Sequence, residues 1–327
     1  MTSQRPASGL LPQAPASRPA WAPGDTPIAM VMISLNEAHN MAAVLDNLAG
    51  FAQEVFLVDS YSSDRTVDLA LERGVHVVQR RFRGFGDQWN YAMMALPVTA
   101  PWTMKLDPDE RLTDDLKQSI RRILAAGEAE AFTVRRRLWF MGQPLPATQV
   151  ILRGWRTGTC RFSDVLVNEH PLVTARTVAA DGILEHHDSP DLHHWTDKQN
   201  RYSTAEAISA FRGLKLSATP RLFGTALERR MWLKRNFHRL PFRYTILHAY
   251  NLFATGAWRA GAVGRVWARL RVQVHLAREL KLMDMTLSGK IYELPEPPVG
   301  QPHPGAVQAD DTEPAPQPGA SAARSRD

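Results

Sequence analysis

The stretch PWTMKLDPDE, residues 101–110, decides the fold, because a short apolar run ends abruptly in three carboxylates. Such a run between turn formers is typical of a buried strand in a parallel sheet, and ligands of open α/β sheets bind where these strands end. We therefore expect Asp107, Asp109 and Glu110 at the mouth of a crevice. Carboxylates this close repel one another unless a cation joins them, and oxygen ligands suit Mg²⁺ or Mn²⁺. The alternative is an acidic helix N-terminus, because a helical pattern follows from Thr113.

Strand and helix patterns alternate at short spacing before this stretch. In chain order, the alternating strands and helices are predicted at residues 28–35, 41–48, 54–58, 64–73, 75–79, 85–96 and 102–106. The alternation predicts an α/β fold with a doubly wound, mostly parallel sheet, whose right-handed crossovers bring the strand ends to one edge. Asn36, Asp59, Asp64 and Asp107 follow strand ends and should share that edge, although Asn36 and Asp64 are also common turn residues. No glycine-rich dinucleotide or Walker pattern follows the first strand, which argues against a dehydrogenase or a P-loop enzyme.

The composition of the chain indicates its size class, its partners and its compartment. The chain has 327 residues, of which 44% are hydrophobic and 22% charged, so it is long enough for a substantial core. The formal charge of +6 favours polyanionic partners, among them anionic lipid and phosphorylated substrates. The single cysteine, Cys160, excludes an intramolecular disulfide and fits a reducing compartment. No stretch offers the roughly eighteen uninterrupted apolar residues of a membrane span.

The region from Arg221 to Arg243 interleaves arginines with large apolar side chains. This pattern is typical of a basic amphipathic helix that lies on an anionic membrane surface. A second helical block, 244–285, follows it. As an alternative to membrane binding, these segments could form a helical subdomain whose aromatic side chains face its own core. No nucleic-acid-binding module accompanies the basic residues, so we expect no nucleic acid partner.

Four motifs together resemble one known family. They are IAMVMISLNE (28–37), LVDSYSSDRTVDLA (57–70), RRFRGFGDQWNYAM (80–93) and MKLDPDERL (104–112). In this order and spacing they resemble the nucleotide-sugar domain of family 2 glycosyltransferases with the GT-A fold, and most of all the branch of bacterial lipopolysaccharide-core β-glucosyltransferases. The resemblance is specific over residues 28–113, looser as far as Tyr202, and thin beyond it.

The resemblance implies roles on the donor side. Asp59 would contact the nucleotide base, and Asp107 and Asp109 would bind Mg²⁺ or Mn²⁺ together with the sugar-nucleotide diphosphate. Glu110 matches the acid that often follows that motif, while Pro108 stands where alanine is commoner. The remaining candidates for donor binding are Asn36, Glu37 and Asp64 at the strand ends, and Arg83, Gly86, Gln88 and Asn90 in a segment that resembles a loop near the diphosphate.

The acceptor side is expected in the later part of the domain. The segment DVLVNEH, 164–170, resembles a family stretch that carries a glutamate, which implies Glu169 as the base that removes the acceptor hydroxyl proton, with Asp164 in reserve. Glu169 could instead form an ion pair with a neighbouring arginine. In similar enzymes a histidine before the helix with Lys198, Asn200 and Tyr202 completes the metal site, and here that is His187 or His186. Zinc held by neighbouring histidines is not expected, because adjacent imidazoles diverge.

The sequence thus predicts an inverting, metal-dependent glycosyltransferase, cytoplasmic and peripheral on the inner face of the cell membrane. Its donor would be a nucleotide-diphosphate sugar, and its acceptor a lipid-linked saccharide of bacterial cell-envelope polysaccharide or lipopolysaccharide. The alternatives are a nucleotidyltransferase of sugar phosphates, which should show a glycine-rich loop after the first strand, and a non-catalytic basic adaptor on the membrane surface. The expected parts are a disordered leader (1–27), a catalytic domain (28–213, with halves 28–113 and 130–213), a basic helical region (214–294) and a disordered tail (295–327).

Overall fold

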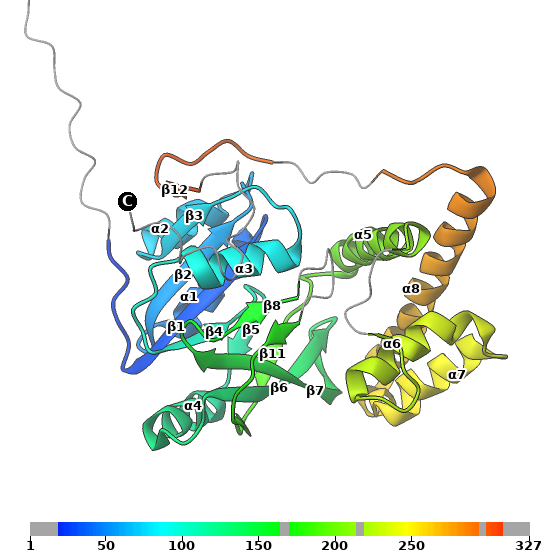
Figure 1. The fold of residues 1–327 in the computed structure, drawn as a ribbon, viewed down its shortest axis with the longest axis horizontal. Coiled ribbons are helices and arrows are strands. Elements are labelled where there is room, and N and C mark those ends of the chain that lie inside the picture. The colour runs from blue at the N-terminus through cyan, green and yellow to red at the C-terminus, as the bar shows by residue number, and fades with distance from the viewer. Residues whose placement is uncertain (1–18, 164–169, 214–218, 294–298, 310–327) are drawn as a thin grey trace, which may run out of the picture.

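The computed structural model describes residues 19–163, 170–213, 219–293 and 299–309, and one mixed sheet runs through it (Figure 1). The strand order is β12-β3-β2-β1-β4-β7-β6-β11-β5, and β10 pairs with β6 beside this path. A separate two-stranded sheet joins β8 to β9. Helices from the C-terminal part of the chain lie at one end of the molecule (Figure 1).

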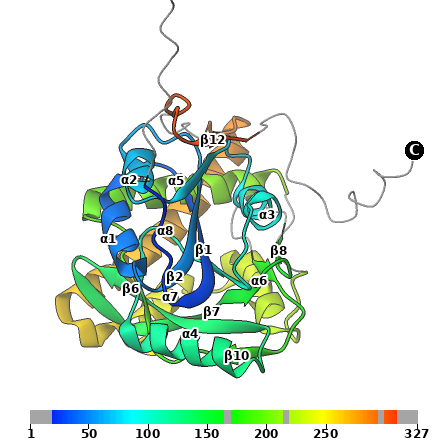
Figure 2. The same cartoon turned by 90° about the vertical axis from the view of Figure 1, so that its left-hand side faces the viewer.

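The parallel half of the sheet forms from the alternating patterns. Its elements are β1 (Thr26–Ser34), α1 (Ala38–Leu48), β2 (Ala52–Asp59), α2 (Thr66–Glu72), β3 (His76–Gln79), α3 (Phe85–Ala95) and β4 (Trp102–Lys105). Alternate side chains of the buried strands enter two cores: Met30 packs with residues of α1 and α2, whereas Val31 packs with residues of α3. The helices accordingly cover opposite faces (Figure 2). The predicted α/β fold with a doubly wound, mostly parallel sheet is confirmed.

After the acidic stretch the chain turns into a short strand rather than a helix. This half contains β5 (Glu110–Leu112), α4 (Asp114–Ala126), β6 (Ala131–Phe140), β7 (Gln143–Arg156), β8 (Arg161–Phe162), β9 (Pro171–Leu172), β10 (Thr177–Ala179) and β11 (Leu184–His186). Thr113 caps α4 by accepting a hydrogen bond from the backbone N–H of Leu116, and Gly127 ends it in the left-handed conformation. Asp107 and Asp109 therefore precede β5, Glu110 is its first residue, and none of the three caps this helix.

The C-terminal helices are α5 (Leu192–Phe211), α6 (Ala226–Asn236), α7 (Arg243–Ala249), a π-helical turn η2 (Tyr250–Ala254) and α8 (Gly261–Ser288), with 3-10 turns η1 (Phe237–Arg239) and η3 (Ala257–Ala260) between them. The basic stretch was expected to form one helix, but it is divided. A capping box of Thr225 and Glu228 starts α6, and a 3-10 turn with Pro241 after it separates α6 from α7. Among the helices of the described residues, none combines the length and the apolar character needed to cross a bilayer.

The expected disordered tail includes an ordered piece. Residues 299–309 are described, and their strand β12 (Val307–Gln308) pairs in parallel with β3 at the edge of the sheet. The end of the expected leader is also ordered, because the indole of Trp21 donates to the carbonyl of Ala52 at 3.0 Å. Both chain ends of the described structure therefore pack against the parallel half.

Candidate active site

The acidic residues lie in a tight turn between β4 and β5. The backbone N–H of Glu110 donates to the carbonyl of Asp107 at 2.9 Å, and the N–H of Asp107 donates to the Glu110 carboxylate at 3.1 Å. The guanidinium of Arg111 braces the same turn by donating to the carbonyls of Pro108 (2.6 Å) and Glu110 (2.7 Å). These bonds hold the backbone of the turn and the carboxylate of Glu110 in place.

Pairing of β5 with β11 brings a histidine to this turn. The antiparallel register places His186 opposite Glu110, and the N–H of His187 continues it by donating to the carbonyl of Asp109 at 2.8 Å. Because side chains alternate along a strand, only one of two adjacent histidines faces the carboxylates. The Nε2 atom of His186 lies 3.2 Å from the Asp109 carboxylate, whereas the ring of His187 stacks on Trp139 at 4.8 Å. Of the two predicted candidates, the structure brings His186 to the site.

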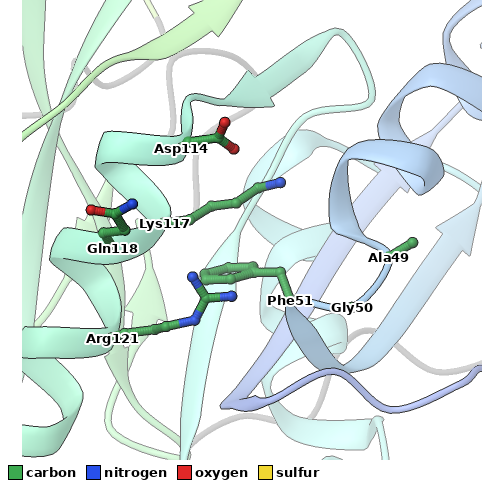
Figure 3. Close-up of a pocket in the computed structure, with 7 residues that line it drawn as sticks. All are labelled: Ala49, Gly50, Phe51, Asp114, Lys117, Gln118 and Arg121. Atoms are coloured by element: carbon green, nitrogen blue, oxygen red, sulfur yellow. The ribbon is translucent and has the colours of Figure 1, made fainter.

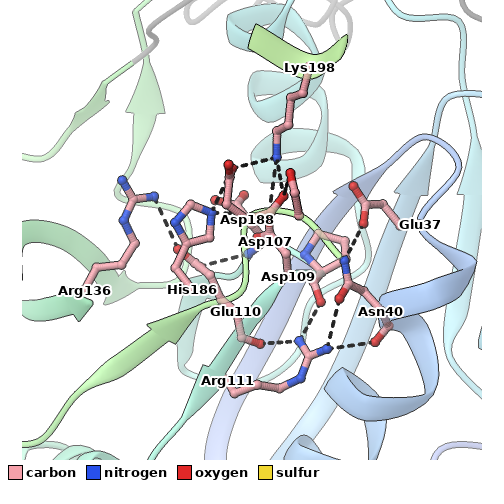
Figure 4. A network of polar contacts seen from close by, with 12 residues as sticks. Glu37, Asn40, Asp107, Asp109, Glu110, Arg111, Arg136, His186, Asp188 and Lys198 are labelled. Carbon is pink, nitrogen blue, oxygen red and sulfur yellow. Dashed lines mark hydrogen bonds and ion pairs between the residues drawn. The ribbon is translucent and has the colours of Figure 1, made fainter. Parts of the chain in front are cut away.

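One ligand atom each from Asp109, His186 and Asp188 lies within 4.8 Å of the other two (Figure 4). Lys198 reaches into this group from α5, with its Nζ atom 3.5 Å from Asp109 and 3.0 Å from Asp188. The Oδ1 atom of Asp109 is buried and has no hydrogen-bond partner among the described residues. An unsatisfied carboxylate oxygen is costly in the interior, so this atom fits a cation ligand.

Charges in the group are strongly coupled. Burial alone would raise the pKa of the Asp109 carboxyl, but His186 and Lys198 hold it well below its usual range. Burial would lower the pKa of Lys198, yet Asp109 and Asp188 raise it above its usual range. Asp109 is thus ionised and ready to bind a cation near neutral pH.

The second carboxylate of the motif has another partner. Asp107 lies 3.0 Å from the guanidinium of Arg153, and Glu110 lies 2.5 Å from the same group. Arg136 approaches Glu110 at 3.5 Å. Burial would raise the pKa of Asp107, but Arg153 lowers it. Asp107 was predicted as a metal ligand; the structure places it beside the group of Asp109, His186 and Asp188 rather than within it, held by an arginine from β7.

Glu37 faces the cluster from the loop after β1 (Figure 4). Its carboxylate accepts a hydrogen bond from the side chain of Asn40 at 2.9 Å. Burial and the negative charge of Asp109 raise the pKa of Glu37 to about 7. A cation bound at Asp109 would offset that negative charge.

Asp59 is the centre of a second network at the ends of β1 and β2. Its buried carboxylate accepts hydrogen bonds from the hydroxyl of Ser34 (2.9 Å), the side chain of Gln79 (3.0 Å) and both the backbone N–H (2.8 Å) and hydroxyl of Ser62. The same Ser62 hydroxyl oxygen accepts from the N–H of Asn36 at 2.8 Å. Asp59 therefore organises the loop after β2.

The other donor-side candidates differ in their surroundings. Asp64 accepts from the N–H of Ala38 at 3.1 Å, which joins the loops after β1 and β2. Gln88 is buried and accepts from Arg80 at 2.9 Å, while the amide of Asn90 makes two hydrogen bonds with the backbone of Phe162. The hydrogen bonds of both side chains therefore hold α3 against neighbouring segments.

The other two candidates of that segment, Arg83 and Gly86, differ in burial. Gly86 is buried within α3, and Arg83 is exposed before it. The predicted base Glu169 and its reserve Asp164 lie outside the described residues. Sequence reasoning did not single out Asp188 or Arg153 as site residues. The only sequence signal for Asp188 was its place directly after the histidine pair.

A surface pocket lies away from this site, between the turn after α1 and helix α4 (Figure 3). Lys117 and Arg121 extend over the ring of Phe51, with Lys117 Nζ at 5.9 Å and the Arg121 guanidinium carbon at 5.0 Å from its centroid. The turn before β2 lies at the amino ends of the parallel strands, opposite the edge where ligands of such sheets bind. We therefore assign these cations to packing on the aromatic ring.

The sequence profile of a known family covers part of this site. The profile of glycosyl transferase family 2 matches residues 30–159, which include the Asp59 loop and the acidic turn. The protein is a glycosyltransferase with a family 2 domain. It is therefore a nucleotide-sugar transferase, and together with the mixed sheet the match identifies the predicted GT-A fold.

Two bacterial glycosyltransferases are among the relatives of this chain. A lipopolysaccharide core biosynthesis glycosyltransferase of Rhizobium meliloti is 27% identical over 258 residues, which cover 74% of this chain and 86% of that protein. An uncharacterised glycosyltransferase of Rickettsia prowazekii is 22% identical over 207 residues, which cover 58% of this chain and 70% of the relative.

Solved structures show weaker likeness. TarS of S. aureus in complex with UDP-GlcNAc has 13% identity and a TM-score of 0.40, over 81% of this chain and 93% of that one. A second structure is glucosyl-3-phosphoglycerate synthase of Mycobacterium tuberculosis in complex with Mn²⁺, UDP and phosphoglyceric acid. It has 15% identity and a TM-score of 0.38, over 62% of this chain and 86% of that one. The family assignment rests on the sequence matches.

Proposed function

We propose that this glycosyltransferase moves a sugar, with inversion, from a UDP-sugar to a lipid-linked saccharide of the bacterial cell envelope. The observation that carries the donor half is the approach of Asp109, His186 and Asp188 within 4.8 Å at the carboxyl edge of the sheet. Two carboxylates and an imidazole suit Mn²⁺ or Mg²⁺. The buried, unpartnered Oδ1 of Asp109 supports the same assignment.

A divalent cation at this group supplies Lewis acidity, which stabilises the charge that develops on the departing diphosphate. The protein groups around it have separate tasks. Lys198 adds a positive charge beside the same carboxylates, and Arg153 fixes the direction of Asp107. Both arrangements exist before the donor binds, and preorganised charge is the largest usual contribution to such catalysis.

The nucleoside is assigned to the ends of β1 and β2. Asp59 holds the Ser62 loop, and Asn36 and Asp64 tie that loop to the start of α1. The carboxyl ends of these neighbouring strands lie at the same edge as the acidic turn, so a nucleotide there would direct its diphosphate toward Asp109. The proton acceptor in the proposal is Glu169, with Asp164 in reserve, as the family resemblance implies.

The acceptor half rests on the helical region and on the relative in lipopolysaccharide core biosynthesis. Large side chains are exposed there that a core would bury: Phe223 is 98% exposed and Phe242 82%. Glu228 is the single acidic residue from Arg221 to Ala260, among eight lysines and arginines. Exposed aromatic rings among arginines fit the interface of an anionic membrane, where a lipid-linked acceptor is held.

Metal-dependent turnover tests the proposal. A panel of UDP-, GDP- and dTDP-sugars is scored for hydrolysis with Mn²⁺, Mg²⁺ or chelator. UDP-sugars with metal should be favoured, and Asp109→Asn should lose about a hundredfold or more in rate, because it removes a charge from the cation site. Turnover that is equal with chelator, or an Asp109→Asn variant that binds UDP with Mn²⁺ as wild type does, would reject the metal assignment.

A further inference from the structure

Residues 299–309, here called the C-terminal strap, lie against the loop that holds Asp59. The N–H of Gly300 donates to the carbonyl of Tyr61 at 2.7 Å, and β12 then pairs with β3 through Val307 and Gln308. The strap follows α8 in the chain but lies beside β3 (Figure 1). It thus adds a covering segment to the nucleoside end of the sheet.

The side chain of Gln79 joins the strap to Asp59. Its Oε1 atom accepts from the N–H of His303 at 2.6 Å and from the side chain of Gln308 at 3.1 Å. Its Nε2 atom donates to Asp59 at 3.0 Å, and the residue is fully buried. A planar amide whose oxygen and nitrogen both have partners has one orientation. By donating to the amide oxygen of Gln79, the strap directs its NH₂ group to the carboxylate of Asp59.

The strap also fits tightly against the loop itself. A Cβ atom at Gly300 would lie 2.4 Å from the carbonyl oxygen of Ser62, so the close approach requires glycine. His303 adds a second anchor, because its Nε2 atom lies 3.0 Å from Asp68 on α2. Ser62 is therefore held by Asp59 on one side and enclosed by the strap on the other.

We propose that Gln79 is a positioning residue for the nucleoside of the donor, and that the C-terminal strap sets its position. The inference rests on the proposed function, which assigns the nucleoside to the Asp59 loop. A loop that is already ordered binds its ligand without the entropy cost of ordering. The strap therefore raises affinity for the nucleoside without contributing to the metal site.

The test uses two probes on the full chain. UDP with Mn²⁺ reports on the whole donor site, whereas inorganic pyrophosphate with Mn²⁺ reports on the metal side alone. His303→Pro removes the N–H that Gln79 accepts, and His303→Ala is its matched control, because it keeps the N–H and loses the same imidazole. Gln79→Leu removes the bridge from the other end. Binding is measured by calorimetry, and thermal melting verifies that each variant is folded.

We expect His303→Pro and Gln79→Leu to raise the Kd of UDP about tenfold, and His303→Ala less than about threefold, as the loss of preorganisation predicts. The Kd of pyrophosphate should stay within about twofold in all of them. In turnover the KM for the donor should rise while kcat is retained.

Unchanged or tighter UDP binding in His303→Pro and Gln79→Leu would overturn the inference. An equal loss of affinity for UDP and pyrophosphate would also overturn it, because it would indicate general destabilisation. Asp59→Ala separates the two proposals. If it leaves UDP binding intact, the nucleoside site of the proposed function is wrong. If it weakens UDP while the strap variants do not, only the strap inference fails.

Discussion

Lys198 places its ammonium 3.0 Å from the carboxylate of Asp188, inside the group that is assigned to a metal ion. In the absence of metal this cation balances the charge of Asp109 and Asp188. Lys198→Met should lower the unfolding free energy of the metal-free protein by about 3 kcal/mol, because it removes the ammonium from two buried carboxylates and leaves them only the imidazole of His186. It should also tighten Mn²⁺ binding several-fold, because a competing cation is gone. Melting with and without Mn²⁺ measures both effects.

The control for that variant is Lys281→Met. Lys281 on α8 donates to the carbonyl of Asn200 on α5 at 2.9 Å and so belongs to helix packing. Its replacement should change stability without changing Mn²⁺ affinity. Equal Mn²⁺ affinity in Lys198→Met and wild type would contradict the competition.

Arg153 is the shared partner of Asp107 and Glu110, with its side chain 6% exposed and that of Glu110 fully buried. Arg153→Met should cost about 3–5 kcal/mol of stability, because buried Glu110 and neighbouring Asp107 would both lose the guanidinium that they share. Adding Glu110→Gln should recover part of this loss. The more exposed Arg136 serves as the control, since Arg136→Met should cost less than about 1 kcal/mol. Urea denaturation of wild type, Arg153→Met, Glu110→Gln and the double variant gives the coupling energy, and strictly additive losses would refute it.

Glu37 predicts a pH dependence of stability for the metal-free protein. Its pKa is raised from 4.5 to about 7 in the fold, so the native state binds this proton more tightly than the unfolded state. The contribution, about 3 kcal/mol, is present below pH 4.5 and is lost as pH rises from 4.5 through 7. Glu37→Gln cannot titrate, so the decline in unfolding free energy between pH 5 and 7.5 should be smaller than in wild type. An identical decline in both proteins would show that Glu37 does not cause it.

The exposed aromatic side chains predict membrane affinity. Phe223→Ser and Phe242→Ser together should reduce binding to vesicles that contain anionic lipid by about tenfold or more, because each removes a large apolar group from the interface. Leu172→Ser is a matched control, since Leu172 on β9 is 57% exposed but lies outside the helical region. Co-sedimentation at low and high salt measures the effect. An equal loss of vesicle binding in Leu172→Ser would show that the effect comes from a more polar surface in general and not from the helical region.

The parallel half of the sheet could be predicted from the sequence, because each strand and helix there is set by a local pattern. The run from Ile28 and the apolar residues before Asp107 are buried strands, and each ends one residue before its predicted end. Asp109 was predicted as a candidate for the same reason, since the acidic turn follows the strand β4. The C-terminal strap could not be predicted, because its composition resembles disorder and its order depends on contacts with distant residues such as Gln79.

The rest of the site depends on pairing between distant segments. Asp188 follows β11 in a stretch that looks like an ordinary turn, and only the β5–β11 pairing brings it to Asp109. Arg153 lies within β7, where nothing in the local pattern distinguishes it from the other arginines of the sheet. The choice between His186 and His187 is likewise a matter of register, which spacing alone does not determine.

The short β5–β11 ladder has a consequence for how this enzyme tolerates changes in length. Three residue pairs define the register, from Leu184 opposite Leu112 to His186 opposite Glu110. A slip of one residue would turn an acid, Glu185, or the second imidazole toward Asp109 and exchange the chemistry of the site. Insertions and deletions ahead of Leu184 are therefore harmless to catalysis only where the preceding loop absorbs them completely.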